Sequence, residues 1–151
     1  MKRIHLLFFA LVGFFLWMQP TEAHASDERQ ISFAELPSTA QTFMKRYFDK
    51  AQISRIFVED EFESDQEFKV YMVGGDEVEF DAMGDWKEVK TIERPLPEGI
   101  VPQPIRAFVA QRYPEAKAHK ISRDRRGYEV DLDNGYELEF NRQFKLREVD
   151  R

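Results

Sequence analysis

The sequence predicts an α+β fold: a tandem repeat of one helix followed by a four-stranded antiparallel meander, with the helices packed on one face of the sheet or sheets. The first observation behind this prediction is internal similarity between the two halves of the chain. The others are helical spacing of apolar residues and short alternating segments separated by turn residues. We divide the chain into a signal peptide at 1–25, a first repeat at 26–92, a connector at 93–100 and a second repeat at 101–151.

The leader has the three-part pattern of a secretory signal peptide. A basic start at Lys2-Arg3 precedes an apolar stretch, Leu6–Trp17, and the small residues Ala23 and Ala25 occupy the positions that a signal peptidase reads. The alternative is a membrane anchor, but this stretch spans only about 18 Å as a helix, against about 30 Å of hydrocarbon. We therefore expect cleavage after Ala25, a periplasmic or secreted product, and no membrane association afterwards.

Composition restricts the class of partner. The chain contains no cysteine, so packing among its 14 phenylalanines must supply the stability that disulfides give to many exported proteins. Its formal net charge of −6 argues against nucleic acid and anionic lipid, both of which require a basic surface. The charge favours a basic partner.

Each repeat is predicted to begin with a helix. Prolines at 37, 102 and 104 suit a first helical turn, where the missing N–H would have no partner in any case. Residues spaced by four, three and four positions lie on one helical face. These residues are Leu36, Ala40, Phe43 and Tyr47 in the first helix and Val101, Ile105, Phe108 and Arg112 in the second.

Four strands are predicted after each helix, and their short connections predict antiparallel neighbours in chain order. The predicted strands are Ile53–Glu63, Phe68–Val73, Asp76–Ala82 and Trp86–Thr91, then Ala118–Arg123, Tyr128–Asp133, Tyr136–Asn141 and Lys145–Asp150.

The register of the central hairpins follows from which residues must face inward. A two-residue turn at Asn134-Gly135 would place Val130 against Glu139, which sets an apolar residue against a charged one. A three-residue loop, Asp133–Gly135, with Gly135 in the left-handed conformation pairs Val130 with Leu138 instead. The same loop predicts pairs Tyr128–Phe140, Val70–Val78 and Phe68–Phe80.

The sequence lacks the groups that most catalytic and metal centres require. After the leader it has one histidine, His119, which we expect on a surface strand, and there is no cysteine for a nucleophile or a zinc site. Gly74-Gly75 is a hairpin turn and not a phosphate-binding loop. We therefore expect no catalytic residue, no cofactor and no transition-metal ligand, and hence a protein that is not an enzyme.

The densest acidic run, residues 59–67, has two interpretations. It lacks the ordered alternation and central glycine of a calcium-binding loop, which favours a solvated hairpin tip. Binding of a divalent cation there is the alternative.

The predicted register also gathers carboxylates on the outer face of the sheet. Asp131 should oppose Glu137 and Glu129 should oppose Glu139, although like charges placed opposite each other destabilise a sheet. Lys120, Lys145 and Arg147 could compensate as a charge ladder, as Lys69 does for Glu79; a basic partner or a cation across the face, or a pair of general acids, are the alternatives. The candidate partner-binding residues are Glu77, Glu79, Glu129, Asp131, Glu137 and Glu139.

Several of these segments resemble one family of exported bacterial proteins. Leu36-Pro37 with Phe43 and Phe48, then the stretches 75–81 and 84–89, make the chain similar to the PepSY-like family, often described as β-lactamase-inhibitor-like. The second half departs from this pattern with Phe144 and Leu146 in place of Gly84 and Trp86. The resemblance implies a tandem helix-plus-sheet fold and a non-catalytic, inhibitory or protein-binding role.

The sequence therefore predicts a non-enzymatic periplasmic protein that binds or inhibits a protein or peptide partner. The alternative is a calcium- or ligand-responsive envelope protein that uses its acidic runs.

Overall fold

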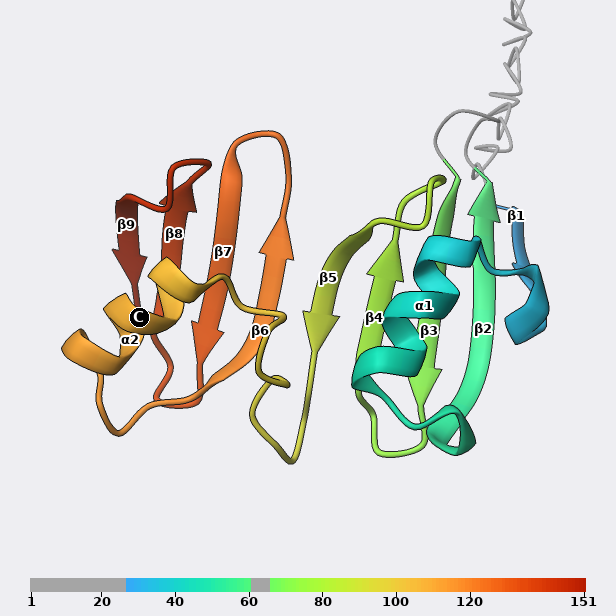
Figure 1. The fold of residues 1–151 in the computed structure, drawn as a ribbon, viewed down its shortest axis with the longest axis horizontal. Helices are drawn as coiled ribbons and strands as arrows, with labels where there is room; N and C mark the ends of the chain where they lie inside the picture. The colour runs from blue at the N-terminus through green and yellow to red at the C-terminus, as the bar shows by residue number, and fades with distance from the viewer. Residues whose placement is uncertain (1–26, 61–65) are drawn as a thin grey trace, which may run out of the picture.

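The computed structural model describes residues 27–60 and 66–151. The predicted signal peptide and its cleavage site after Ala25 lie outside the described residues. The described chain forms one antiparallel sheet and two α-helices (Figure 1). The strands are β1 Asp27–Gln30, β2 Ile53–Asp60, β3 Glu67–Met72, β4 Glu77–Phe80, β5 Trp86–Lys90, β6 Ala118–Arg123, β7 Gly127–Leu132, β8 Glu137–Asn141 and β9 Leu146–Asp150. The helices are α1 Ser38–Tyr47 and α2 Gln103–Arg112, with short 3-10 turns at Phe33–Glu35 and Lys50–Gln52.

The predicted fold class, a tandem repeat of a helix and a four-stranded meander, is wrong. The structure is mostly a single nine-stranded sheet in the order β1 to β9. Strand β1 lies before the first helix in the chain and pairs with β2, which follows that helix. Strand β5 pairs with β6, with Val89 opposite Ile121. The sequence did not predict β1 because its residues are all polar and show no alternation. It did not predict the β5–β6 pairing because a long connection containing a helix separates those strands.

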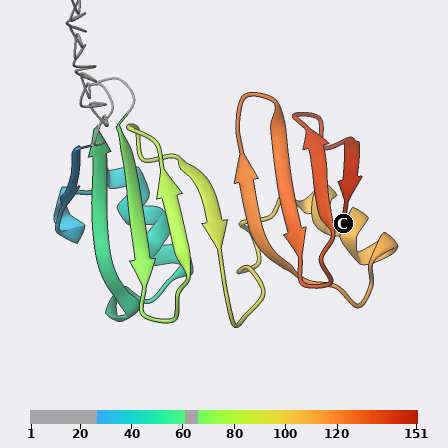
Figure 2. The same cartoon turned by 180° about the vertical axis from the view of Figure 1, so that it is seen from behind.

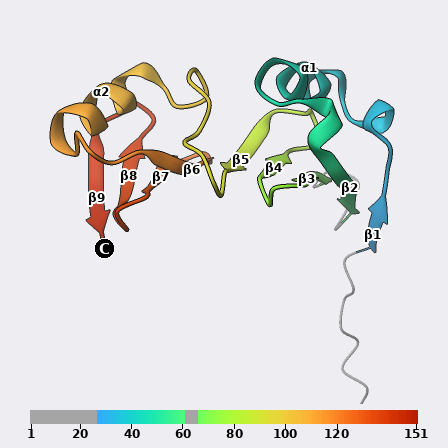
Figure 3. The ribbon, with the colours of Figure 1, turned by 90° about the horizontal axis from the view of Figure 1, so that it is seen from below.

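Both helices lie on the same face of the sheet, which we call the inner face (Figure 3). Pro37 and Pro102 immediately precede the two helices, so of the three prolines predicted for a first helical turn only Pro104 lies within one. Helix α1 buries Ala40 and Met44, and α2 buries Ile105 and Val109. On the opposite face, which we call the outer face, the described part of the chain places no helix (Figure 2).

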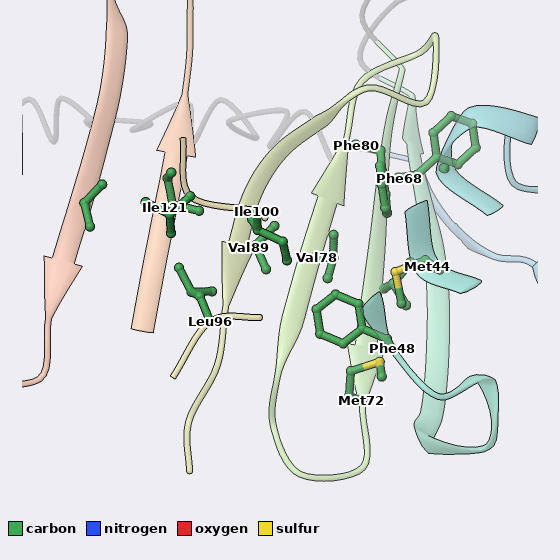
Figure 4. Packing of buried hydrophobic residues seen from close by; sticks show 14 of the residues in the cluster. Met44, Phe48, Phe68, Met72, Val78, Phe80, Val89, Leu96, Ile100 and Ile121 are labelled. Atoms are coloured by element: carbon green, nitrogen blue, oxygen red, sulfur yellow. The ribbon is translucent and has the colours of Figure 1, made fainter. Parts of the chain in front are cut away.

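The core is continuous across the junction between β5 and β6. Val89 on β5 and Ile121 on β6 are fully buried neighbours, and Leu96 and Ile100 from the connection pack beside them (Figure 4). The N–H of Leu96 also donates to the carbonyl of Ala118, 2.9 Å away. The connection therefore contributes to the core as well as linking the strands.

The predicted hairpin registers are confirmed. The N–H of Gly135 donates to Leu132 O at 3.0 Å, the N–H of Leu132 donates to Tyr136 O at 2.8 Å, and Gly135 has a φ of +85°. Any other residue would be strained in this conformation. The pairs are Val130–Leu138 and Tyr128–Phe140 in β7–β8, and Val70–Val78 and Phe68–Phe80 in β3–β4.

The turns after β4 and β8 differ at one position, which is Gly84 in the first half of the chain and Phe144 in the second. Gly84 has a φ of +82°, and a Cβ there would lie 2.7 Å from Pro37 Cβ. In the other turn Phe144 adopts a φ of +60°, and its ring centroid lies 5.3 Å from that of Tyr128. The contact between these two rings accompanies a left-handed conformation that a phenylalanine rarely adopts.

Candidate functional site

Three carboxylates converge on the outer face of the sheet. Glu129 and Asp131 lie two positions apart on β7, so both point outward, and Glu137 lies on β8 opposite Asp131. One oxygen from each of the three lies within 4.8 Å of the others. Among the described side chains, only these three form such a group of potential metal ligands. We call Glu129, Asp131 and Glu137 the β7–β8 carboxylate cluster.

Asp131 is the central member of this cluster. Its Oδ1 atom is buried, and it has no hydrogen-bond partner among residues 27–60 and 66–151. A buried carboxylate oxygen that lacks a donor is destabilising unless a cation or water satisfies it. The cluster therefore offers an unsatisfied acceptor between two further carboxylates.

The electrostatics of the cluster confirm that its charges repel. The negative charge of Glu129 is the largest cause of the raised pKa of Glu137, and burial, Asp131 and Asp150 raise that pKa further. A pKa raised mainly by neighbouring anions indicates a site at which a bound cation would be favourable.

Lys120 on β6 partly compensates the cluster. Its Nζ lies 3.7 Å from Glu129 Oε1 and 3.4 Å from Glu88 Oε2 on β5. Burial lowers the pKa of Lys120, but Glu88, Asp131 and Glu129 raise it by more, so the ammonium stays charged. The other predicted compensating residues, Lys145 and Arg147, form no ion pair within 4.0 Å among the described side chains. The predicted charge ladder is therefore incomplete.

The other three predicted residues lie outside the cluster. Glu139 faces Glu129 from β8, as predicted. Glu77 and Glu79 lie on β4, which β5 and β6 separate from β7. Glu77 faces Lys90, and Glu79 faces Lys69, whose Nζ lies 4.0 Å from Glu79 Oε1 and 2.9 Å from Glu59 Oε1.

Glu79 differs electrostatically from the cluster. Burial is the largest cause of its raised pKa, Lys69 lowers that pKa, and Glu88, Glu67 and Glu77 raise it. The outer face thus has a charge-balanced region on β3–β4 and an unbalanced anionic region on β7–β8.

The acidic run at 59–67 is only partly described. Glu59 and Glu67 face each other across β2 and β3, and each pairs with a lysine, Lys69 and Lys87 respectively. Residues 61–65 lie outside the described residues, so the interpretation of the run as a hairpin tip or a cation site stays a prediction.

A groove of about 260 Å³ runs beside the cluster on the outer face. Glu129 and Glu139 line it on one side and Glu79 and Glu88 on the other, with Arg147 at its edge. Glu129 is the member of the cluster that lines this groove, and the basic residues Lys87, Arg123 and Arg126 line it as well.

A larger cleft lies away from the cluster. It measures about 1240 Å³ and is bordered by the turns after β4 and β6. Arg123 and Trp86 both line it: the Arg123 guanidinium lies 4.1 Å from the centroid of the Trp86 ring, and its Nε donates to Trp86 O at 2.7 Å.

The histidine predicted for a surface strand, His119, lies in β6. Its carbonyl accepts from Thr91 N at 2.8 Å.

Two further residues affect the electrostatics of the cluster and were not predicted from the sequence. Glu88 holds Lys120 from β5, and Asp150 on β9 lies opposite Glu137. Asp150 could have been found by extending the predicted register to the last strand, because Val149 aligns with Leu138. Glu88 could not, because its effect depends on the unpredicted β5–β6 pairing.

The cluster has the chemistry of a site for a hard divalent cation. Calcium binds carboxylate oxygens at about 2.4 Å, so two ligands of one ion lie at most about 4.8 Å apart. The separation of the three carboxylate oxygens, within 4.8 Å, meets this limit.

Comparison of the sequence with known proteins gives a match to one protein family. Residues 66–148 match a family model described as putative beta-lactamase-inhibitor-like, PepSY-like. No curated protein matches the sequence.

Three solved structures share the fold. A putative periplasmic protein of the DUF2874 family from Bacteroides vulgatus is 40% identical, with a TM-score of 0.79 over 84% of this chain and 99% of that one. A putative calcium-regulated periplasmic protein from Bacteroides thetaiotaomicron is 35% identical, with a TM-score of 0.80 over 84% of this chain and 99% of that one. Another putative periplasmic protein from Bacteroides vulgatus is 26% identical, with a TM-score of 0.76 over 82% and 99% of the two chains. Within the described residues, no helix is long and apolar enough to span a membrane.

Proposed function

We propose that this chain, which belongs to the PepSY-like family described as putative beta-lactamase-inhibitor-like, is a periplasmic protein that binds a calcium ion at the β7–β8 carboxylate cluster. The observation that carries the proposal is the convergence of three carboxylates around the buried, unsatisfied Oδ1 atom of Asp131. The cation would satisfy that oxygen and relieve the repulsion that raises the pKa of Glu137.

A structural relative supports the choice of cation. The 35% identical protein from Bacteroides thetaiotaomicron is described as putatively calcium-regulated and covers most of this chain. Oxygen-only ligands also suit calcium better than zinc or copper, which prefer nitrogen and sulfur. Magnesium is less suitable because it requires a near-ideal octahedron.

The expected affinity is low. Three carboxylates supply only part of the six to eight oxygens that calcium takes, so water must complete the shell. Open sites of this kind in extracellular proteins bind in the range of about 0.1–1 mM. Lys120 lowers the affinity further, because its ammonium lies 3.7 Å from Glu129 and competes with the ion.

Thermal melting in calcium tests the proposal. With a dissociation constant of about 1 mM, 10 mM calcium adds about 1.4 kcal/mol to the free energy of unfolding. That corresponds to a rise in melting temperature of roughly 5 °C for a protein of this size. Asp131→Asn should abolish the rise. Glu77→Gln, which changes the position on β4 that corresponds to Glu137 on β8, should leave the rise intact. An unchanged wild-type melting temperature at 10 mM calcium would exclude the site.

A second candidate function is binding of a basic protein partner by the outer face. The family description and the half-buried anionic region around Glu129, Glu137 and Glu139 support it. Like calcium, a lysine or arginine of the partner could enter the groove beside the cluster and pair with the carboxylates.

An enzyme assay tests the second candidate. A panel of β-lactamases should be inhibited by the wild-type protein and less inhibited by a variant carrying Glu137→Gln and Glu139→Gln. Absence of inhibition across the panel would remove the inhibitory role. Equal inhibition by both proteins would place the contact elsewhere on the molecule.

A further inference from the structure

Strand β9 is an edge of the sheet that residues 27–60 and 66–151 form. It pairs with β8 on one side, and all five of its residues are exposed. A sheet edge presents unpaired N–H and C=O groups, to which another extended chain can add as a further strand.

The ladder determines which backbone groups of β9 are free. On β8, the carbonyl of Tyr136 accepts a hydrogen bond from β7. Backbone groups alternate in direction along a strand, so the N–H and C=O of Leu138 also point to β7, whereas those of Glu137 and Glu139 point to β9. Glu137 faces Asp150 and Leu138 faces Val149. The N–H and C=O of Val149 therefore point away from β8, into solvent.

The side chains of β9 give this edge a distinct chemistry on each face. Val149 and Leu146 point to the inner face but remain 40% and 39% exposed. Glu148 and Asp150 point to the outer face beside Glu139 and Glu137. An added strand would meet an apolar surface on one side and four carboxylates on the other. Arg147 lies at the bulge and faces the groove beside Glu139.

A second copy of this chain is a poor occupant of the edge. Antiparallel pairing of β9 with itself must keep inner residues opposite inner residues. The registers that do so place Glu148 opposite Glu148, or Glu148 opposite Asp150. Like charges at directly opposed positions destabilise such a pair.

We propose that β9 binds an extended peptide segment of another envelope protein by strand addition, and that this segment alternates basic and apolar residues. Its apolar side chains pack on Val149 and Leu146, while its lysines or arginines face Glu148 and Asp150. Its backbone bonds to the free N–H and C=O of Val149. The edge adjoins the calcium site, because Asp150 faces Glu137. The proposal of strand addition nevertheless does not require calcium to bind.

Titration of labelled peptides tests the proposal in calcium-free buffer. The probe is a fluorescent hexapeptide of alternating lysine and valine. One comparison peptide alternates glutamate and valine, and the other, which we call the blocked peptide, has three lysines followed by three valines. The alternating basic peptide should bind at least tenfold more tightly than either comparison peptide. Equal binding of the alternating and blocked peptides would indicate charge attraction alone and overturn strand addition.

Two variants separate strand addition from binding elsewhere. Val149→Pro removes the outward N–H without breaking a bond to β8, and Val149→Thr keeps that N–H. The proline variant should lose at least tenfold in affinity while the threonine variant stays within twofold. Equal affinities would overturn the proposal. If Val149→Pro lowers the melting temperature, Glu148→Lys with Asp150→Lys replaces it and should reverse the preference toward the glutamate peptide.

Amide exchange gives a direct readout. On peptide binding the amide of Val149 should exchange more slowly, while that of Glu148, already directed at β8, should not change. Unchanged exchange at Val149 would overturn the proposal. A wild-type dimer in sedimentation equilibrium that Val149→Pro dissociates would also overturn it, because the occupant would then be a second copy.

Discussion

Asp131 on β7 lies directly opposite Glu137 on β8 and directly opposite Lys120 on β6. Its carboxylate is therefore flanked by an anion on one side and a cation on the other. The ammonium of Lys120 nonetheless forms its ion pairs with Glu88, at 3.4 Å, and with Glu129, at 3.7 Å. This arrangement makes Lys120 the internal competitor of any cation that binds the cluster.

Removing that competitor should strengthen calcium binding. Lys120→Gln is expected to raise the affinity for calcium by roughly threefold to tenfold, because a positive charge within 4 Å of a ligand is lost. Lys69→Gln is the matched control, since Lys69 holds Glu59 and Glu79 in the same way on β3. Calorimetric titration measures both. An equal effect of the two substitutions would show a general charge effect rather than competition at the cluster.

The raised pKa of Glu137 has a consequence for stability. An acid whose pKa is higher in the folded than in the unfolded protein destabilises the fold once it ionises. This destabilisation is absent below the unfolded value of about 4.3 and grows as the pH rises through the raised folded pKa of Glu137.

Glu137→Gln should therefore raise the melting temperature at pH 7.5 in chelator and have little effect at pH 3.5. Glu77→Gln, at the same hairpin position on β4, should give no comparable gain, because Glu77 faces Lys90. A gain of equal size at both pH values would contradict the electrostatic cause.

Two glycines with nearly the same φ should respond differently to alanine. Gly84 and Gly135 have φ values of +82° and +85°. A Cβ at Gly84 would lie 2.7 Å from Pro37 Cβ and 2.9 Å from Ala40 N, whereas nothing lies within 4 Å at Gly135. Gly135→Ala should cost about 1 kcal/mol for the backbone alone.

Gly84→Ala should cost about 3 kcal/mol or more, because the turn must also move away from α1. Urea denaturation measures both free energies of unfolding. Similar losses would mean that the approach of this turn to the helix is looser than the structure indicates.

The connection after β5 is anchored by a buried carboxylate. Asp76 is 7% exposed, and its carboxylate accepts from Ile92 N at 2.9 Å and from Arg94 Nη2 at 2.9 Å. Asp76→Ala should lower the free energy of unfolding by about 2–3 kcal/mol, because the Ile92 N–H loses its acceptor. Asp133→Ala is the control, since its exposed carboxylate accepts from Lys117 N and from no other donor in the described residues. It should cost about 1 kcal/mol or less in the same urea titration.

The hairpins could be predicted from the sequence because their inward residues determine the register. In β7–β8 only one turn length sets Val130 against Leu138, and that choice also sets Asp131 against Glu137. Two opposed pairs of the anionic region were therefore predictable. That Glu129 and Glu137 also approach each other diagonally depends on side-chain conformation, which a register does not determine.

The rest of the architecture could not be predicted for physical reasons. Strand β1 is stabilised by pairing with β2 alone, without an apolar pattern of its own. The β5–β6 pairing joins segments that are distant in the chain, so no local turn indicates it. The six predicted partner-binding residues were treated as one surface, but Lys90 and Lys120 lie between Glu77 and Asp131.

The central claim is that calcium binds Glu129, Asp131 and Glu137 together. A calcium titration of the protein labelled with carbon-13 at its side-chain carboxyls, followed by nuclear magnetic resonance, measures this directly. If calcium binds the cluster, these three carboxyl signals should shift together and saturate with one dissociation constant near 1 mM, while those of Glu77 and Glu79 stay in place. If the three signals do not move, or if those of the acidic run at 59–67 move instead, the claim is wrong.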